Sequence, residues 1–284
     1  MDWTLLLIAS VVLLVIVSLF VFTGCSQLAD ADDWPPSSDP DPTYDEVIVF
    51  EPNLVGYWPL SEKPPDPASF ATTAEDKSGN DNHGEYKKEG GTLLQDQPGI
   101  VDASSTYFAG GAHVEVPGNP SMNLATFSAE AWVSFDGEEQ DPDDPNAHFY
   151  TVLDSSEQVP GVEFRGYALY VAPGNKCEVF LGGQGEGENG VSASGGAISV
   201  DSPTHVGVSF DGQFARLFVN GTFINSVEVN SYLTPTNRPL TIGAGLHQGS
   251  VLYEFQGRIE KVAVYDTALP DQHFADHFAL LPKD

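Results

Sequence analysis

Basic residues and cysteines are scarce in this 284-residue chain. Eleven lysines and arginines stand against 41 aspartates and glutamates, which gives a formal net charge of −30. Such a charge repels phosphate backbones and therefore disfavours nucleic acid as a partner. The two cysteines, Cys25 and Cys177, lie in segments of different character. We expect no disulfide between them, and we expect Cys177 to be a small buried residue.

Uncharged apolar sequence is confined to one long run near the N-terminus, Thr4 to Gly24. A helix of this length would reach across about 30 Å of hydrocarbon, so residues 1–25 are predicted to anchor the chain to a membrane. Two forms of anchor remain open. One is a retained transmembrane helix, and the other is a lipoprotein signal cleaved before Cys25, because Phe22 to Ser26 resembles a lipobox. Both place the rest of the chain on the extracytoplasmic side, periplasmic or at the cell surface.

Proline, aspartate and serine dominate residues 26–44, which predicts an extended linker before a globular domain at 45–284. Within the domain, Thr204 to Val229 predicts three antiparallel strands, because apolar residues alternate and Asp211-Gly212 and Asn220-Gly221 supply hairpin turns.

Similar strand-like runs recur at short intervals, beginning at Glu46 to Phe50, and are separated by loops such as the glycine-rich Gly182 to Gly196. The only segment with helical spacing outside the anchor is Leu269 to Leu280. The pattern predicts an all-β sandwich of two antiparallel sheets.

Seven segments, in order, resemble the successive motifs of laminin G-like, concanavalin A-like jelly-roll domains: LVGYWPLSE, DKSGNDNHG, FAGGAHVEVP, TFSAEAWVSF, THVGVSFDGQFARLFVNG, LTIGAG and GRIEKVAVYDTALPDQH. They cover almost all of the chain from about Val47 to His277. The resemblance implies a two-sheet jelly roll and a role in binding. The Trp-His-His-Val motif that usually precedes the hairpins is replaced here by Pro203-Thr204-His205-Val206.

The family also has catalytic relatives, the jelly-roll glycanases, which need two carboxylates on either side of one sugar bond. The acidic clusters at Glu138 to Asp144 and at Glu186 and Glu188 lie among prolines or glycines, so we interpret both as solvated loops. Glu130 heads an apolar strand and is expected to be structural. His273 and His277 lie four residues apart, but without a recognised motif we interpret them as packing residues. We predict that the chain is not an enzyme.

Calcium is the one cofactor that the sequence favours. Asp76 to Asn82 forms an oxygen-rich turn, in which Asp76, Asn80 and Asn82 are candidate ligands of this hard cation. The resemblance implies an additional acid from the last strand, Glu260. The alternative is that these side chains only hydrogen-bond their own turn.

Function is predicted as a class. The chain is expected to be a non-catalytic, membrane-anchored binding module for a glycan or a protein. The alternatives are an accessory subunit of a larger energy-converting or transport complex in the membrane, and a glycanase.

Overall fold

The computed structural model describes residues 42–281, except 67, 139, 145–146, 160–162 and 184–189. The predicted anchor and Cys25, and the predicted linker up to Asp41, lie outside these residues. Within the part that is described, no helix is both long enough and apolar enough to cross a membrane. The described residues belong to a compact unit that starts at Pro42.

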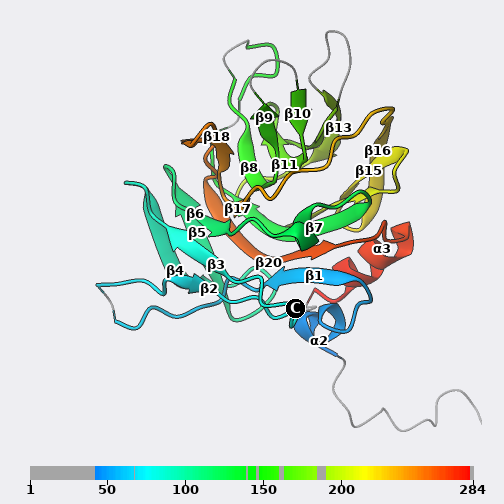
Figure 1. Cartoon of the computed structure of the whole chain (residues 1–284). Coiled ribbons are helices and arrows are strands. Elements are labelled where there is room, and N and C mark those ends of the chain that lie inside the picture. The colour runs from blue at the N-terminus through cyan, green and yellow to red at the C-terminus, as the bar shows by residue number, and fades with distance from the viewer. Residues whose placement is uncertain are drawn as a thin grey trace, which may run out of the picture. The chain divides into compact units, whose positions relative to one another are not determined.

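Two antiparallel sheets form the body of this unit (Figure 1). Sheet A contains, in spatial order, β16 (Thr222–Glu228), β15 (Phe214–Val219), β14 (Thr204–Phe210), β7 (Phe127–Phe135), β20 (Gly257–Tyr265), β5 (Ser104–Ala109) and β4 (Thr92–Pro98), with β1 (Leu54–Trp58) also paired to β20. Sheet B contains β13 (Gly190–Ala197), β12 (Lys176–Gly182), β11 (Tyr167–Ala172), β8 (Tyr150–Asp154), β17 (Leu240–Ile242), β6 (His113–Val116), β3 (Gly84–Lys87) and β2 (Thr73–Ala74).

Two short hairpins and two helices complete the described fold. The hairpins are β9 (Glu157–Val159) with β10 (Glu163–Arg165), and β18 (Gly245–His247) with β19 (Ser250–Leu252). The helices are α2 (Tyr44–Ile48) and α3 (Asp271–Ala279), and one 3-10 turn spans Pro120–Met122. Figure 1 shows β9, β10 and β18 at the opposite end of the domain from α2 and α3.

The predicted three-stranded meander is confirmed as β14, β15 and β16. Asp211 Oδ1 accepts hydrogen bonds from the backbone N–H groups of Gln213 and Phe214, which closes the first turn. Asn220 and Gly221 have φ angles of 50° and 69°, as the second turn requires. The meander forms one end of sheet A, and β14 joins it to the rest of the sheet by pairing with β7.

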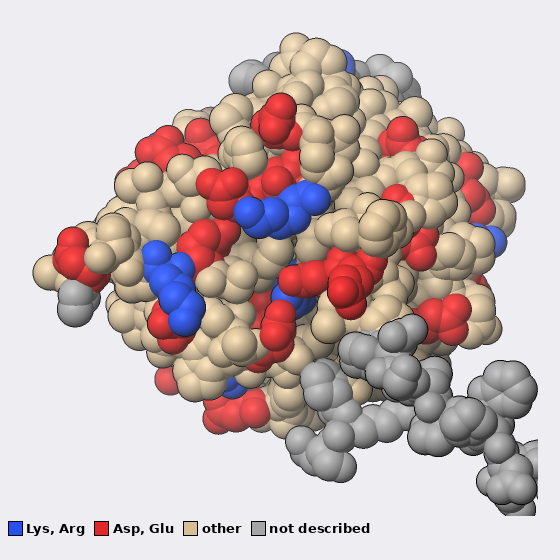
Figure 2. Space-filling view, turned by 90° about the horizontal axis from the view of Figure 1, so that it is seen from below, with Lys and Arg blue, Asp and Glu red and all other residues tan. Residues whose placement is uncertain are grey.

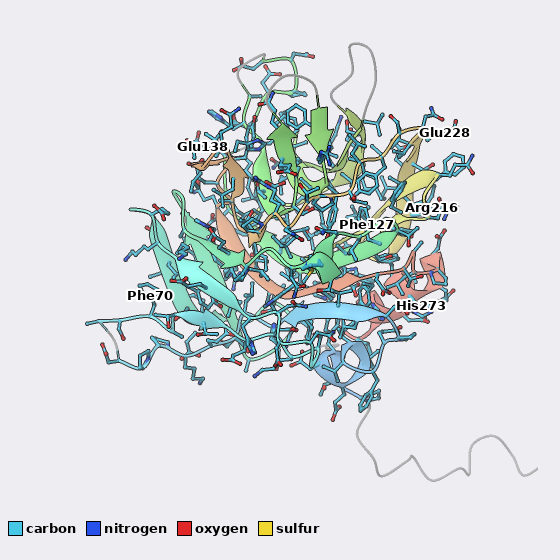
Figure 3. All side chains as sticks on the ribbon, viewed as in Figure 1. Phe70, Phe127, Glu138, Arg216, Glu228 and His273 are labelled. Carbon is cyan, nitrogen blue, oxygen red and sulfur yellow. The ribbon has the colours of Figure 1, made fainter. Side chains whose placement is uncertain are left out.

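The main core fills the space between the two sheets. Phe127 lies there (Figure 3), and its ring stacks on Tyr167 at a centroid distance of 3.9 Å. Cys177 is buried in this core, as predicted. A second apolar layer covers the outer face of sheet A, where Phe274 of α3 stacks on Phe218 at 4.1 Å. α3 can approach closely because a Cβ on Gly207 would lie 2.6 Å from the Phe274 ring.

Two local predictions were wrong. The expected strand at 46–50 is instead helix α2 and its end, because Thr43 and Glu46 form a capping box whose local hydrogen bonds outweigh the β-branched run. The last residues of the expected loop at 182–196 belong to strand β13. Glycine suits this strand because a Cβ on Gly196 would lie 2.6 Å from Val219, so the two sheet edges meet closely there.

Candidate functional site

An aromatic pocket opens on the face of sheet B that is turned away from the core. Strand alternation builds its floor, because Leu169 and Val179 point into the core while their neighbours point outward. The outward residues are Tyr170 on β11 and Glu178 and Phe180 on β12, and Tyr170 is directly opposite Glu178 in the strand register. The main sheet therefore supplies a rigid base for the pocket.

The short hairpins and the loops beside them form the walls around a cavity of about 290 Å³. Phe164 of β10 meets Phe180 edge to face at a centroid distance of 5.6 Å. Phe149, before β8, and Tyr253, after β19, each meet Tyr170 in the same way, at 5.6 and 6.2 Å. Such a volume lies near the lower end of the usual range for ligand sites, about 300–1,000 Å³. Five aromatic rings thus surround a space suited to a small ligand.

Polar groups are few in this pocket and are placed at its edges. Ser156 Oγ and His247 Nε2 are buried, and neither has a hydrogen-bond partner within the described part of the chain. Burial raises the pKa of the Glu178 carboxyl. Asp154 lies behind Ser156 and accepts a hydrogen bond from its backbone N–H at 2.7 Å. The pocket therefore combines apolar ring faces with unused hydrogen-bonding groups, which is the usual composition of a ligand site.

Neighbouring cavities extend this depression around the β18–β19 hairpin. A second cavity of about 230 Å³ shares Phe149 and Tyr253 with the first. A third, of about 610 Å³, shares Gly110 and Glu254 with the second. The shared residues indicate a groove that is longer than the aromatic pocket alone.

The chemistry of the aromatic pocket favours binding. Glu178 is the one carboxylate among its described lining residues. A glycanase needs two carboxyl groups about 5 to 10 Å apart across the substrate. Asp154, which lies behind Ser156, is fully buried and accepts backbone hydrogen bonds from Ser156 and Leu246. The described lining therefore offers ring faces for stacking and does not offer a pair of exposed acids.

None of these residues was identified from the sequence. Other tyrosines lie elsewhere, because Tyr86 and Tyr167 are core residues and Tyr150 lines the second cavity. A usable signal was present, because Tyr170 alternates with Leu169 and Val171 and must face away from the core. The missing information was which loops fold over that outer face.

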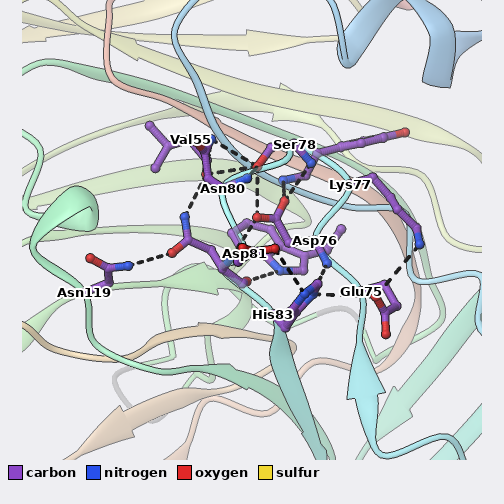
Figure 4. A network of polar contacts seen from close by, with 12 residues as sticks. Val55, Glu75, Asp76, Lys77, Ser78, Asn80, Asp81, His83 and Asn119 are labelled. Carbon is purple, nitrogen blue, oxygen red and sulfur yellow. Dashed lines mark hydrogen bonds and ion pairs between the residues drawn. The ribbon is translucent and has the colours of Figure 1, made fainter.

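The predicted calcium loop is a closed hydrogen-bond network (Figure 4). Oδ1 of Asp76 accepts hydrogen bonds from the backbone N–H groups of Tyr57 and Ser78, both at 2.9 Å. Its Oδ2 accepts from the Ser78 hydroxyl and from the Asn82 N–H, also at 2.9 Å. The amide groups of Asn80 and Asn82 both donate to the carbonyl oxygen of Val55. Asp76, Asn80 and Asn82 thus lie together in this loop and hydrogen-bond its backbone.

Glu260 has different partners. Its two carboxylate oxygens accept hydrogen bonds from the backbone N–H groups of Ile100 and Val101, at 2.9 and 2.6 Å. Asp76 and Glu260 therefore already have donors for all four carboxylate oxygens. These contacts support the alternative in which the side chains order their own loops, and calcium at this position stays a prediction.

Glu130 is the centre of a second buried network, on the outer face of sheet A. Its carboxylate accepts hydrogen bonds from the Tyr265 hydroxyl at 2.6 Å and from His205 Nε2 at 2.9 Å. His277 Nδ1 of α3 lies 2.9 and 3.1 Å from its two oxygens. On the other side of the imidazole ring, His277 Nε2 lies 3.3 Å from Glu51 Oε1. The structural role expected for Glu130 is thus visible as a junction of β7, β14, β20 and α3.

Charge pairing dominates the electrostatics of this network. Burial by itself would raise the pKa of Glu130, but the charge on His277 and the hydrogen bonds from His205 and His277 hold it well below its usual range. Burial would lower the pKa of His277, yet the carboxylates of Glu130 and Glu51 raise it to about 9. An ionised Glu130 and a protonated His277 therefore stabilise each other at neutral pH.

A search against protein families assigns this sandwich to a known class. The family model described as the concanavalin A-like lectin/glucanases superfamily matches residues 108–275. The chain belongs to this superfamily, and the resemblance seen in the sequence is confirmed. A search of curated proteins finds no match.

Solved structures with the same fold include a toxin binding domain and two domains that were solved with a bound saccharide. The binding domain of Paraclostridial mosquitocidal protein 1 is 15% identical with a TM-score of 0.55, and the match covers 80% of this chain and 52% of that one. Domain 4 of AbnA, an extracellular arabinanase of Geobacillus stearothermophilus, is 18% identical with a TM-score of 0.52, covering 81% and 98%. The CBM40 domain of a Ruminococcus gnavus sialidase is 18% identical with a TM-score of 0.51, covering 67% and 98%. The chain thus spans about half of the toxin domain and matches nearly all of the two others.

The Asp76 network predicts a stability effect that does not depend on an ion. Asp76→Asn should lower the free energy of unfolding by about 2–4 kcal/mol, because an amide cannot accept all four hydrogen bonds. The loss should be equal in EGTA and in Ca²⁺ when measured by chemical denaturation. Asp81→Asn is the matched control, since its side chain is 92% exposed. A loss that appears only with Ca²⁺ would instead make Asp76 an ion ligand.

The Glu130 network predicts a pH-dependent stability effect. Glu130→Gln should lower the free energy of unfolding by about 3–5 kcal/mol near pH 6, because it leaves a protonated His277 without its main counter-charge. The pKa of His277 is raised from its ordinary value of 6.5 to about 9. Its stabilising contribution is therefore complete below about pH 6.5 and is lost as the pH rises through 9.

The cost of Glu130→Gln should accordingly shrink between pH 6.5 and 9.5 when measured by denaturation in EDTA. Tyr265→Phe is the control, because it removes one hydrogen bond to Glu130 and no charge. Its smaller cost should not change over this pH range. An equal cost of Glu130→Gln at both ends of the range would contradict the charged pair.

Proposed function

We propose that this chain is a non-catalytic carbohydrate-binding module whose aromatic pocket binds a neutral saccharide. The observation that carries the proposal is the ring of Phe149, Phe164, Tyr170, Phe180 and Tyr253 on the outer face of sheet B. Apolar C–H faces of sugar rings stack on aromatic side chains, while their hydroxyl groups need nearby hydrogen-bond partners. Ser156 Oγ, His247 Nε2 and Glu178 supply such partners at the same place.

Charge favours neutral saccharides over acidic ones. Glu178 is the charged residue of the aromatic pocket, and Glu254 lines the adjoining cavity. The chain as a whole has a formal net charge of −30. A sialic acid or uronic acid would bring a carboxylate toward these groups, and burial at the pocket would strengthen the repulsion.

The structural neighbours support binding as the general role. The CBM40 domain was solved with α2,3-sialyllactose, and domain 4 of the arabinanase was solved with arabinotriose. Both are sugar-binding domains that form part of larger glycan-degrading enzymes. Arabinotriose carries no charge, so the second neighbour fits the electrostatics of this chain better than the first.

We further propose that the domain is displayed on the extracytoplasmic side of a membrane, held by residues 1–25 through either anchor. The apolar run from Thr4 to Gly24 and the proline-rich stretch after it support this arrangement. The domain starts beside α2, and β10 and β18 lie at its opposite end (Figure 1). Both strands contribute lining residues to the aromatic pocket, Phe164 and His247. A pocket in that position would remain open to a ligand approaching from outside.

One observation favours the alternative of an accessory subunit in a membrane complex. Phe50, just after α2, is a large apolar residue that is 85% exposed. A large apolar group at this position would suit contact with another subunit or with lipid. Acidic side chains surround this end in separate groups with few basic ones (Figure 2), so a partner here would need a basic surface.

Glycan binding can be tested on an array of neutral and sialylated saccharides that includes arabinotriose and α2,3-sialyllactose. We expect the full-length chain to bind neutral members, with no requirement for sialic acid. Tyr253→Ala should weaken the affinity about 10-fold or more, because a stacked ring contributes about 1–2 kcal/mol. Affinity would be measured by isothermal titration calorimetry with the best ligand of the array.

Phe223→Ala is the matched control for Tyr253→Ala. Both rings are partly exposed, but Phe223 lies on β16, the edge strand of sheet A. Its removal should leave glycan affinity unchanged. Binding that survives Tyr253→Ala, or that requires sialic acid, would contradict the proposed site.

Anchoring predicts how the native chain behaves in its membrane. We expect it to stay with the membrane in high salt and to be released only by detergent, because apolar insertion does not depend on salt. Intact-mass analysis would then distinguish a retained Met1 from a lipidated Cys25. Migration alone after mild extraction agrees with a tethered binding module, whereas co-migration with a large complex would favour the accessory subunit. Release by salt alone would contradict both forms of anchor.

A further inference from the structure

A cluster of two histidines and one glutamate lies where α3 meets the segment after α2. His273 and His277 are four residues apart on α3 and therefore share one face of the helix (His273 is labelled in Figure 3). Glu51 follows α2 and lies against this face. Its Oε1 is 3.2 Å from His273 Nδ1 and 3.3 Å from His277 Nε2. Residues more than 200 positions apart in the sequence thus place three ligand-type atoms together.

The spacing of these atoms fits a metal ion. The ligand atoms of Glu51, His273 and His277 all lie within 4.8 Å of one another. In a tetrahedral zinc site with bonds of about 2.0–2.2 Å, neighbouring ligand atoms are about 3.3–3.6 Å apart. Two sides of the triangle already have about this length, so only the distance between the two histidine nitrogens has to adjust.

His277 also has the hydrogen-bonding partner that is typical of a metal-binding histidine, a carboxylate at its other ring nitrogen. Its Nδ1 faces Glu130, which Tyr265 and His205 hold in place from the other side. A histidine that donates its Nδ1–H to a carboxylate has its Nε2 directed away from that carboxylate, here toward Glu51, and this Nε2 can bind a metal ion once it releases its proton. The buried network thus orients His277 as a ligand.

The cluster is accessible to solvent at His273, and it contains a carboxylate oxygen without a described partner. The His273 side chain is 34% exposed whereas His277 is 1% exposed, so the cluster is open to solvent on one side only. Glu51 Oε2 is buried and has no hydrogen-bond partner within the described residues. An ion entering from the side of His273 would meet two imidazoles and a carboxylate whose Oε2 has no other partner among the described residues, and water would be its fourth ligand.

We propose that Glu51, His273 and His277 bind one divalent transition-metal ion, Zn²⁺ foremost, that ties α3 to the segment following α2. Two imidazoles and one carboxylate are typical Zn²⁺ ligands, whereas Ca²⁺ and Mg²⁺ prefer oxygen alone. The ion would replace the proton that His277 Nε2 shares with Glu51, and that proton would pass to solvent. This site is separate from the oxygen-rich loop at Asp76 and from the aromatic pocket.

The test uses the untagged full-length chain in mild detergent, stripped with EDTA and dialysed. Titration of Zn²⁺ against a chromophoric chelator should show one ion per chain, and excess Ca²⁺ or Mg²⁺ should not displace it. His273→Gln and Glu51→Gln should each weaken Zn²⁺ binding at least 10-fold. Zn²⁺ should also raise the melting temperature of the unmodified chain, because the ion binds the folded state.

His148→Gln is the matched control, since this exposed histidine lies in the loop before β8. It should bind Zn²⁺ as the unmodified chain does. Circular dichroism would confirm that each variant is folded. The proposal is overturned if the unmodified chain neither binds one Zn²⁺ nor melts higher with it. It is equally overturned if both His273→Gln and Glu51→Gln keep the full affinity.

Discussion

The buried carboxylate of Glu130 is the constraint on which one half of this structure depends. An ionised group without solvent must be surrounded by donors, or the fold loses several kcal/mol. Its donors come from β14, β20 and α3, so these elements can take only positions that bring His205, Tyr265 and His277 to the same two oxygens. The apolar contact of Phe274 with Phe218 and the bare backbone at Gly207 bring α3 close enough for this. Packing and charge pairing therefore determine the same arrangement.

The two outer faces of the sandwich consequently have different chemistry. Helices α2 and α3 cover the outer face of sheet A, where buried ions are paired. Lys261 on β20 joins α2 to sheet A through further ion pairs. Its Nζ lies 2.6 Å from Oδ1 of Asp45 in α2 and 3.0 Å from Oδ2 of Asp102. Among the described residues, short hairpins border the outer face of sheet B, where Phe180 is partly exposed and Tyr170 is buried beneath the neighbouring rings. The core between the sheets keeps the face with the aromatic pocket separate from the face that joins the helices.

Much of the fold could be predicted from the sequence, because strand alternation and turn chemistry are local properties. Val206, Val208 and the Asn220-Gly221 turn specify the meander without help from distant residues. The short segment at 46–50 was misjudged because a capping box at Thr43 and Glu46 has more influence than the β-branched residues between them. The aromatic pocket could not be predicted, because Phe149, Phe164 and Tyr253 come together only through three-dimensional folding of separate loops. For the same reason, the spacing of His273 and His277 was visible in the sequence, but Glu51 was not.

The separation of the faces also bears on the proposal that this member of a lectin and glucanase superfamily binds a saccharide without cleaving it. Hydrolysis needs two carboxylates that remain exposed to the substrate and differ in pKa. Here the acids nearest the aromatic pocket have separate tasks: Glu178 lines the floor, and Asp154 is buried and engaged with the backbone of Ser156 and Leu246. Freeing Asp154 would leave those N–H groups unpaired and would weaken the wall that β18 provides. Asp154 thus holds the backbone beside the pocket in place, an arrangement that agrees with the proposed recognition of a saccharide.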